Sequence, residues 1–355
     1  MRKSTIAIWV SGFIMLVALA STTSAQEIFS DEPGQYSTER LTMNLSCQPG
    51  DLIEIRSAMT LEGTLEIIVH EDAQAHIDYF KKAKTGRKSN AIDYIDLISV
   101  SLSETPTGLK LDMRAPNPAP WSSRESGLVV VEVRIPADCK VKIEAPYFDI
   151  AAVGPFKAFE VPSSMGRLEV SNVTERLDLV TSNRRVTIEN ASGEVRAATT
   201  NSTLIANDID CTGYQAIFRN EGGDIMIERL AGELNIKNSY GRIEIEDFRP
   251  TGRKNYIRGQ YGPITVSVTR METGQLIVNN RYEDVELSLP EDISAVFSLA
   301  VEEEGKIEVS NFEFKPDLIQ QNRLNLVTGE GEALISSSIR GKGNIFVRGE
   351  GEGGS

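Results

Sequence analysis

The sequence predicts an all-β protein: a parallel β-helix (a β-solenoid) preceded by a smaller, irregular β-rich unit. Tyr240, Tyr261 and Tyr282 follow one another at intervals of 21 residues, and each is followed by a short run of alternating apolar and polar residues. Glycines precede many of these runs, as a sharp corner requires. A short strand that recurs in this way cannot bury its apolar face alone, so successive copies are expected to stack.

Residues 1–25 are expected to be an export signal. Arg2 and Lys3 provide a positive start, residues 6–20 are mostly apolar, and small residues at 23–25 offer a cleavage site. The alternative is an uncleaved membrane anchor, but the apolar stretch contains a Ser-Gly pair and is short for a bilayer span. We therefore expect cleavage and no stable membrane span afterwards, because no second apolar stretch of that length follows.

Residues 26–140 are expected to form the N-terminal β-rich unit. Alternating aliphatic residues predict strands there, but these strands follow no common period. Residues 89–98 predict one short helix, with Ser89 as its N-cap and Ile92 among its buried residues. Trp121 lies in a proline-rich loop, where we expect it to pack over the edge of the sheet rather than to anchor a ligand.

Residues 141–349 carry the repeats, and residues 350–355 are expected to be a disordered tail because they are glycine-rich and polar. The repeat length drifts from 18 to about 22 residues and widens to 27 near residues 315–322. A β-propeller is excluded because its blades need about 40 residues each. The crossover preference of parallel strands predicts a right-handed solenoid. The first strands of successive repeats start at Leu168, Val186, Ile225, Ile243, Ile264, Val285 and Ile307.

The 355-residue chain has a formal net charge of −14 and only three cysteines. An acidic surface argues against nucleic acid and against anionic lipid headgroups as partners. Cys47, Cys139 and Cys211 show no C-x-x-C spacing, and an odd number leaves at least one of them outside any intramolecular disulfide. One disulfide is possible in an oxidising compartment, and the spacing does not choose its partners.

No catalytic motif is present: the sequence has no G-x-S-x-G, no P-loop, no dinucleotide fingerprint and no H-E-x-x-H. His70 and His76 are the only histidines, and without a nearby cysteine or an evident third ligand they predict no metal site. Glu286 and Glu308 could fall on adjacent repeats about 5 Å apart, as a paired acid–base or calcium site. We favour ordinary solvent-facing positions for both, and we expect no cofactor.

The three tyrosines and their neighbours are the candidate binding site. Tyr240, Tyr261 and Tyr282 should lie above one another along one corner, about 4.8 Å apart. They form either a structural ladder or a platform that presents ring faces to a sugar chain, and their position at the turns favours the ladder. Polar neighbours keep the platform open, because they could bond sugar hydroxyls or acidic sugars. These neighbours are Arg258, Asn280 and Arg281.

The repeat resembles that of a known bacterial family. Residues 181–201, TSNRRVTIENASGEVRAATTN, look like the β-strand repeat of the bacterial putative-adhesin family, whose relatives include the head domains of autotransporter adhesins. Residues 282–301, YEDVELSLPEDISAVFSLAV, are similar to the closing repeats of that family. The resemblance covers residues 141–349 and implies an adhesin-like fold without catalytic residues. The chain departs from it at the Arg-Arg pair of the first segment and in residues 201–220.

Together these features predict an exported, non-enzymatic protein that acts as a structural or adhesin-like binding module at the bacterial cell envelope. Its partner would be a glycan or a cell-surface protein, and its location periplasmic, cell-surface or secreted. One alternative is a carbohydrate-active β-helix enzyme, which a groove of mixed acidic and basic residues would favour. The other is an envelope assembly subunit whose open end stacks on a partner. No motif specifies an oligomeric state.

Overall fold

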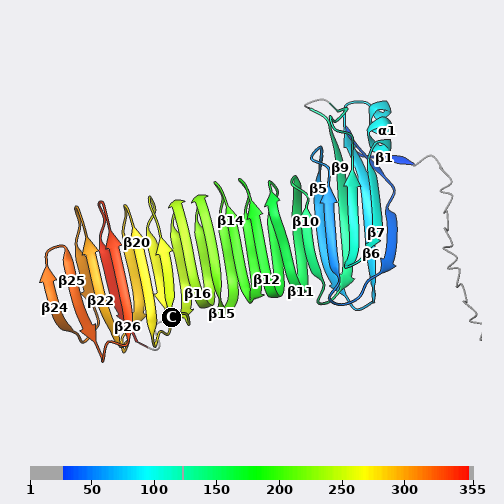
Figure 1. Ribbon diagram of the computed structural model, residues 1–355. Helices are drawn as coiled ribbons and strands as arrows, with labels where there is room; N and C mark the ends of the chain where they lie inside the picture. The colour runs from blue at the N-terminus through cyan, green and yellow to red at the C-terminus, as the bar shows by residue number, and fades with distance from the viewer. Residues whose placement is uncertain (1–26, 122–123, 352–355) are drawn as a thin grey trace, which may run out of the picture.

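The computed structural model describes residues 27–121 and 124–351. Apart from one short helix, its regular structure is all strand, as the alternating sequence pattern predicts. The molecule is elongated, with the N-terminal strands at the taller end and the later strands in a long row (Figure 1). The export signal expected over residues 1–25, and residues 352–355 of the expected tail, lie outside the described residues. No helix in the described part is long and apolar enough to cross a membrane.

The first part of the chain mixes antiparallel and parallel pairing. Its strands are β1 (Ile28–Glu32), β2 (Gln35–Thr38), β3 (Leu41–Ser46), β4 (Leu52–Ser57), β5 (Leu61–His70), β6 (Gln74–Lys84), β7 (Ser99–Thr105), β8 (Gly108–Arg114), β9 (Ser126–Pro136) and β10 (Lys140–Glu144). β6 pairs antiparallel with β2, β3 and β9, and β7 pairs antiparallel with β8. In contrast, β4 and β10 pair parallel, as do β5 and β9.

The helix α1 (Lys88–Asp96) lies close to the predicted residues 89–98. Two details of the prediction are wrong. The N-cap position falls on Arg87, which makes no side-chain cap, rather than on Ser89. Ile92 is 41% exposed, because the buried stripe follows Ala91 and Ile95, which lie one helical turn apart.

Trp121 packs as predicted. Its ring meets the ring of Tyr94 edge-on, with centroids 5.7 Å apart. It also rests against the main hydrophobic core, and Gly127 leaves room for it, since a Cβ there would lie 2.7 Å from the indole. The tryptophan therefore serves packing, as predicted, but it covers the start of β9, which has a strand on each side, rather than the edge of the sheet.

The later strands belong to two continuous ladders. They are β11 (Phe148–Ser164), β12 (Leu168–Thr181), β13 (Val186–Ser192), β14 (Glu194–Thr199), β15 (Leu204–Gly222), β16 (Ile225–Tyr240), β17 (Ile243–Pro250), β18 (Lys254–Arg258), β19 (Ile264–Val268), β20 (Gly274–Asn280), β21 (Val285–Pro290), β22 (Ala295–Val301), β23 (Ile307–Ser310), β24 (Lys315–Gln320), β25 (Arg323–Thr328), β26 (Ala333–Ile339) and β27 (Ile345–Glu350). The long strands β11, β12, β15 and β16 take part in both ladders.

All pairs within each ladder are parallel. The first ladder runs β9, β5, β11, β12, β13, β15, β16, β17, β19, β21, β27 and β23. The second runs β8, β4, β10, β11, β12, β14, β15, β16, β18, β20, β26 and β22. We call one strand of each ladder together a layer. The parallel pairing thus extends into the N-terminal strands. Long segments separate the paired strands there, so the sequence shows no regular period.

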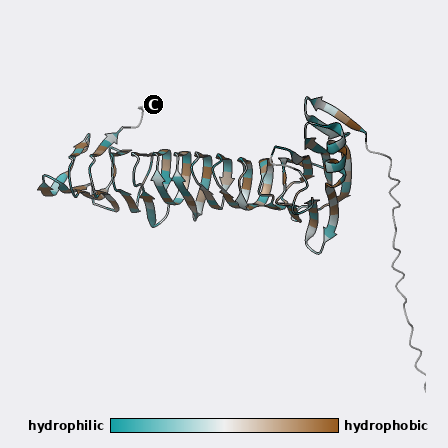
Figure 2. Cartoon of the chain, turned by 90° about the horizontal axis from the view of Figure 1, so that it is seen from above, coloured by the Kyte–Doolittle hydropathy of each residue, from teal (hydrophilic) through white to brown (hydrophobic). Residues whose placement is uncertain are grey.

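The core consists of aliphatic columns that run through the layers. Ile243, Ile264 and Val285 are register partners in the first ladder, and all are buried. Their strand neighbours alternate between buried and exposed, which gives the alternation of hydrophobic and hydrophilic residues visible along the strands (Figure 2). Each such column removes one apolar side chain per layer from water. This burial stabilises the fold by about 25 cal/mol per Å² of apolar surface.

The order of the last layers differs from the order of the sequence. The repeat pattern predicts Ile307 next to Val285, but the register partner of Val285 is Ile345, and Ile307 pairs with Ile345 from the other side. The layer of β26 and β27 is therefore inserted between two earlier ones. All these strands present the same inward aliphatic pattern, so alternation alone cannot order them. The hairpin of β24 and β25 then covers β22 antiparallel.

All three cysteines are buried and free. The Sγ atoms of Cys47 and Cys139 are 3.9 Å apart, whereas Cys211 lies alone in β15. The hydrogen bond between Cys47 and Cys139 lowers the pKa of the Cys47 thiol. The same contact, together with burial, raises the pKa of the Cys139 thiol. Burial raises the pKa of the Cys211 thiol to about 12. The spacing of the cysteines left all three pairings possible. In the structure only Cys47 and Cys139 lie close enough to form a disulfide.

Candidate functional site

Three tyrosine rings stack along one corner of the layers, as their spacing predicts. Tyr240 ends β16, Tyr261 lies between β18 and β19, and Tyr282 lies between β20 and β21. The Tyr261 amide donates to the Ser239 carbonyl at 3.1 Å, and the Tyr282 amide donates to the Gln260 carbonyl at 3.0 Å. The ring centroids are 5.0 and 5.2 Å apart, and the ring planes differ by 10° and 12°.

Glycines end the stack on both sides. Gly222 is the register partner of Tyr240. At the other end, Gly341 lies so close to Tyr282 that a Cβ at this position would be 2.5 Å from the ring atom Cε1. Neither glycine has a side chain that could continue the column. The stack is therefore limited to three rings.

The stacked rings offer edges and hydroxyl groups rather than faces. Nearly parallel rings about 5 Å apart leave no room for a sugar ring between them. Tyr240 and Tyr261 are nevertheless 59% and 43% exposed. Within the described chain, none of the three hydroxyl groups has a hydrogen-bond partner. The corner thus presents a row of free hydroxyls, and its ring faces serve the ladder.

A column of cations stands on the strands that lead to this corner. Arg219, Lys237 and Arg258 are register partners on β15, β16 and β18, and all three are exposed. Each follows a buried residue, so the side chains point to the same solvent side, about 4.8 Å apart along the ladder. The next partner is Asn279, whose side-chain oxygen accepts a hydrogen bond from Ser338 at 2.8 Å.

A hollow of about 400 Å³ joins the column to the corner. Four cations and no carboxylate are among its lining residues, namely Lys237, Arg258, Arg281 and Arg340. The guanidinium of Arg281 lies 5.4 Å from the centre of the Tyr282 ring, and that of Arg258 lies 5.7 Å from the centre of the Tyr256 ring. A neighbouring hollow extends the same surface to Arg219.

None of these five cations has an ion-pair partner among residues 27–121 and 124–351. Elsewhere on the ladders, cations pair with acids two residues away in the chain or in the neighbouring layer. Arg242 lies 3.2 Å from both Asp224 and Glu244. Likewise, Arg229 holds the pKa of the Asp208 carboxyl below its usual range through a hydrogen bond. The surface between the column and the corner is thus positive in a chain whose formal net charge is −14.

The side chain of Asn280 does not reach this surface. Asn280 is 3% exposed, and its Nδ2 donates to the Gly262 carbonyl at 2.9 Å. Its Oδ1 accepts the backbone N–H of Arg281 at 2.9 Å. Asn280 therefore fixes the turn that positions Arg281, whereas Arg258 and Arg281 themselves are exposed.

The paired carboxylates considered from the sequence are not neighbours. Glu286 and Glu308 are both register partners of Phe346, which lies between them on the inserted strand β27. The expected separation of about 5 Å is therefore wrong, because two strand spacings of about 4.8 Å divide the two positions. Glu308 also pairs with Lys306 at 2.5 Å.

Sequence reasoning missed Arg219, Lys237 and Arg340. A signal for the first two exists: each, like Arg258, directly follows the inward residue of the second strand of its repeat. Aligning those strands would have revealed the column. Arg340 carries no comparable signal, because it follows β26, whose place between earlier layers is not evident from the chain order.

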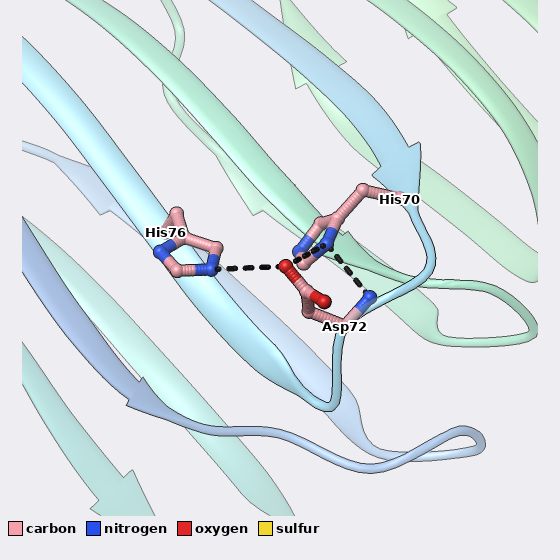
Figure 3. A group of neighbouring side chains, drawn as sticks. All are labelled: His70, Asp72 and His76. Atoms are coloured by element: carbon pink, nitrogen blue, oxygen red, sulfur yellow. Dashed lines mark hydrogen bonds and ion pairs between the residues drawn. The ribbon is translucent and has the colours of Figure 1, made fainter.

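A separate polar cluster lies near the N-terminal end, at the turn between β5 and β6 (Figure 3). Ligand atoms of His70, Asp72 and His76 all lie within 4.8 Å of one another. The third ligand that the sequence did not reveal is thus Asp72. Two imidazoles and one carboxylate are donor groups that a metal ion binds in proteins.

The known proteins similar to this chain are distant. No family model matches the sequence, and no curated protein matches it. Three similar solved structures are a "putative cell adhesion protein" from Clostridium sporogenes (9% identity, 88% of this chain and 100% of that chain covered, TM-score 0.22), a "putative adhesin" from Bacteroides fragilis (9%, 87% and 97%, 0.28), and a "putative lipid binding protein" from Parabacteroides distasonis (12%, 87% and 96%, 0.35). Two of these names agree with the resemblance noted in the repeat. Likeness at these identities and TM-scores says nothing about activity or ligand.

Proposed function

We propose that this protein is an exported, non-enzymatic parallel β-helix that serves as an adhesin-like binding module at the bacterial cell envelope. The parallel register between layers and the inward aliphatic columns support a solenoid over residues 141–349, right-handed by the crossover preference. Residues 26–140 would form the N-terminal β-rich unit and residues 1–25 the export signal. Of the expected tail, residues 350–355, Glu350 still belongs to β27.

The proposed ligand is an acidic glycan, either free or carried by a cell-surface protein. One observation supports this class above others: five exposed cations without ion-pair partners line two neighbouring hollows in an otherwise acidic protein. Local positive charge concentrates anions, and guanidinium groups match carboxylate and sulfate oxygens with paired hydrogen bonds. The free hydroxyls of Tyr240, Tyr261 and Tyr282 would bond sugar hydroxyls along the same surface.

The two alternatives have less support. A glycan hydrolase needs carboxylates at the bound chain, and the lining of the hollow has none. A polysaccharide lyase would instead use an arginine or a lysine as its base, and cleavage of the bound polymer is the result that would favour it. An assembly subunit needs an open end, but β25 covers β22 in the second ladder, and β23, the last strand of the first ladder, has only four residues. The binding module accounts for the cations, which a hydrolase or an assembly subunit would not use.

Binding of polygalacturonate to the purified chain tests the ligand class, with dextran as the neutral polymer. We expect saturable binding of polygalacturonate that weakens as salt rises, and no binding of dextran. The triple variant Arg219→Gln/Lys237→Gln/Arg258→Gln should bind at least about tenfold more weakly, because each lost charge-assisted bond contributes about 1.5 to 3 kcal/mol.

A second triple variant controls for net charge. Arg184→Gln/Arg185→Gln/Arg249→Gln removes three exposed cations that line neither hollow, two in the turn between β12 and β13 and one in β17, and it should bind like the wild type. Equal losses of polygalacturonate affinity in both triple variants would mean that only the net charge of the protein matters. That result would refute the site. Binding of dextran as strong as that of polygalacturonate would refute the acidic ligand class.

The tyrosine edge can be tested without disturbing the stack. The variant Tyr240→Phe/Tyr261→Phe/Tyr282→Phe keeps the rings and removes only the hydroxyls. We expect unchanged thermal stability, since no described residue bonds these hydroxyls, and a severalfold loss of polygalacturonate affinity. Unchanged affinity would restrict the tyrosines to the structural ladder and leave the cations as the whole site.

A further inference from the structure

The only two histidines of the chain meet at one aspartate. His70 ends β5, His76 lies in β6, and Asp72 lies in the turn between them. β5 and β6 flank β9 on opposite sides, so the two imidazoles approach each other across the end of that strand, with ring centroids 5.1 Å apart. In Figure 3 both rings point toward the Asp72 carboxylate. One of its oxygens lies 3.7 Å from Nδ1 of His70 and 3.9 Å from Nε2 of His76.

Hydrogen bonds set the tautomer of each ring. Nδ1 of His76 lies 2.7 Å from the side-chain oxygen of Asn44, so Nδ1 carries the proton and Nε2 keeps its lone pair. Nε2 of His70 lies 2.8 Å from the Gln74 carbonyl, so that nitrogen donates and Nδ1 is the acceptor. In both rings the nitrogen that faces Asp72 is therefore the one with the free electron pair, as a metal ligand requires.

We infer that Nδ1 of His70, the Asp72 carboxylate and Nε2 of His76 form a site for a divalent cation of the zinc class. Two imidazoles with one carboxylate suit zinc and its neighbours in the first transition row rather than calcium or magnesium, which prefer oxygen ligands. Ligands about 2.0 to 2.1 Å from a tetrahedral zinc ion lie roughly 3.3 Å apart. The distances of 3.7 and 3.9 Å need to shrink by about half an ångström, and the two imidazole nitrogens, which lie within 4.8 Å of each other, need to approach as well.

The turn can make that adjustment. The Asp72 side chain is 78% exposed and no cation outside this cluster pairs with it in the described chain. One present contact must be given up: the Asp72 amide donates to Nδ1 of His70 at 3.0 Å. The two histidine side chains are only 17% and 29% exposed; small ring rotations that keep the bonds to Gln74 and Asn44 would bring their nitrogens together. The open side of the turn leaves a fourth position for water or for a donor from another molecule.

Calorimetric titration of the chain with ZnCl₂ tests the site. The chain must carry no histidine tag and must first be dialysed against a chelator. We expect one equivalent of zinc to bind, and each of His70→Ala, Asp72→Asn and His76→Ala to weaken binding at least about tenfold. Asn44→Leu removes only the bond to Nδ1 of His76 and should weaken binding about 10- to 100-fold.

Glu71→Gln is the matched control, because Glu71 is exposed in the same turn and outside the cluster. This variant should bind zinc like the wild type. Thermal unfolding of the metal-free variants, expected to match the wild type, separates lost ligands from lost folding. Zinc binding that survives in His70→Ala/His76→Ala would overturn the site. A preference for CaCl₂ over ZnCl₂ would overturn the metal class, and no binding in the wild type would overturn both.

Discussion

The middle and the two ends of the molecule use the same parallel pairing but reach it by different routes. In the middle each strand pairs with one that follows 18 to 21 residues later, as Leu168 does with Val186 and Ile243 with Ile264. At the ends the spacing is much longer: Leu52 pairs with Gly108, and Val285 pairs with Ile345. A regular sequence period therefore appears only where neighbouring strands also follow one another in the chain. The same parallel pairing forms without it where inward aliphatic residues come into register from distant parts of the chain.

The two ends also share a device. At the N-terminal end the chain forms the layer of β4 and β5, moves outward to β8 and β9, and returns to β10 beside β4. At the C-terminal end it forms β22 and β23 first and then fills the gap behind them with β26 and β27. In both cases an antiparallel strand, β7 or β25, lies against the outer layer. Strand edges that would attract further strands are thereby closed at these positions.

The inserted C-terminal layer yields the largest predicted effect. Ending the chain after Arg340 removes β27, which lies between β21 and β23. Ile345 and Val347 are fully buried there, and each buried aliphatic residue contributes about 2 to 5 kcal/mol. We expect the free energy of unfolding to fall by roughly 5 kcal/mol or more, measured by urea titration.

A chain that ends after Glu350 is the control, since it keeps β27 whole, and it should be as stable as the full chain. If removal of β27 proved equally harmless, the last layer would be a frayed end. The contrast between chain order and spatial order would then fail.

A charge in the regular middle should have the next largest effect. Ile264→Asp places a carboxylate between Ile243 and Val285 in a fully buried column. An unpaired buried charge costs about 3 to 5 kcal/mol. Hydrogen exchange should then show protection lost first in β17, β19 and β21, while the N-terminal strands keep theirs, because stacked repeats are stabilised mainly by their neighbours.

The adjacent substitution Thr265→Lys puts a charge on the solvent side of the same strand, where Thr265 is exposed between Glu244 and Glu286. It should change the stability by less than about 0.5 kcal/mol. Equal effects of both substitutions would contradict the inward and outward assignment of the whole column.

The sequence predicts the regular middle of the molecule better than its two ends. The column of Ile243, Ile264 and Val285 and the tyrosine stack were predictable, because equal spacing places equal residues in register. The insertion of β27 was not, because several strands present interchangeable aliphatic residues. The cluster around Asp72 was not either, because it depends on strands that pair across β9 and not on any sequence period.

At the N-terminal end two cysteines lie close enough to form a disulfide, whereas the middle contains no such pair. The Sγ atoms of Cys47 and Cys139 are 3.9 Å apart and buried, so oxidation needs them to approach by about 2 Å. A disulfide between residues 92 apart should stabilise the fold by roughly 4 to 5 kcal/mol at most, through loss of chain entropy in the unfolded state.

Oxidised glutathione supplies the oxidant, and peptide mapping without reduction identifies the linked pair. Thermal unfolding with and without reductant should then differ for the wild type and for Cys211→Ser, but not for Cys47→Ser. A link that includes Cys211, or stability independent of reductant in the linked protein, would contradict the expectation.

The smallest predicted effect concerns the tyrosine corner, which belongs to the regular middle. Tyr261→Ala removes the central ring and with it both stacking contacts, each of which contributes about 0.5 to 1.5 kcal/mol. We expect a loss of about 1 to 3 kcal/mol by urea titration. Tyr214→Ala is the matched control, because Tyr214 is 59% exposed, as Tyr240 is, and has no ring partner in the described chain. It should be nearly neutral, since its ring contributes no stacking. If both substitutions cost the same, the stack would be three independent surface residues, and the corner would be available for binding alone. A larger cost at Tyr261 would mean that the regular spacing stabilises the middle on its outside as well as in its core.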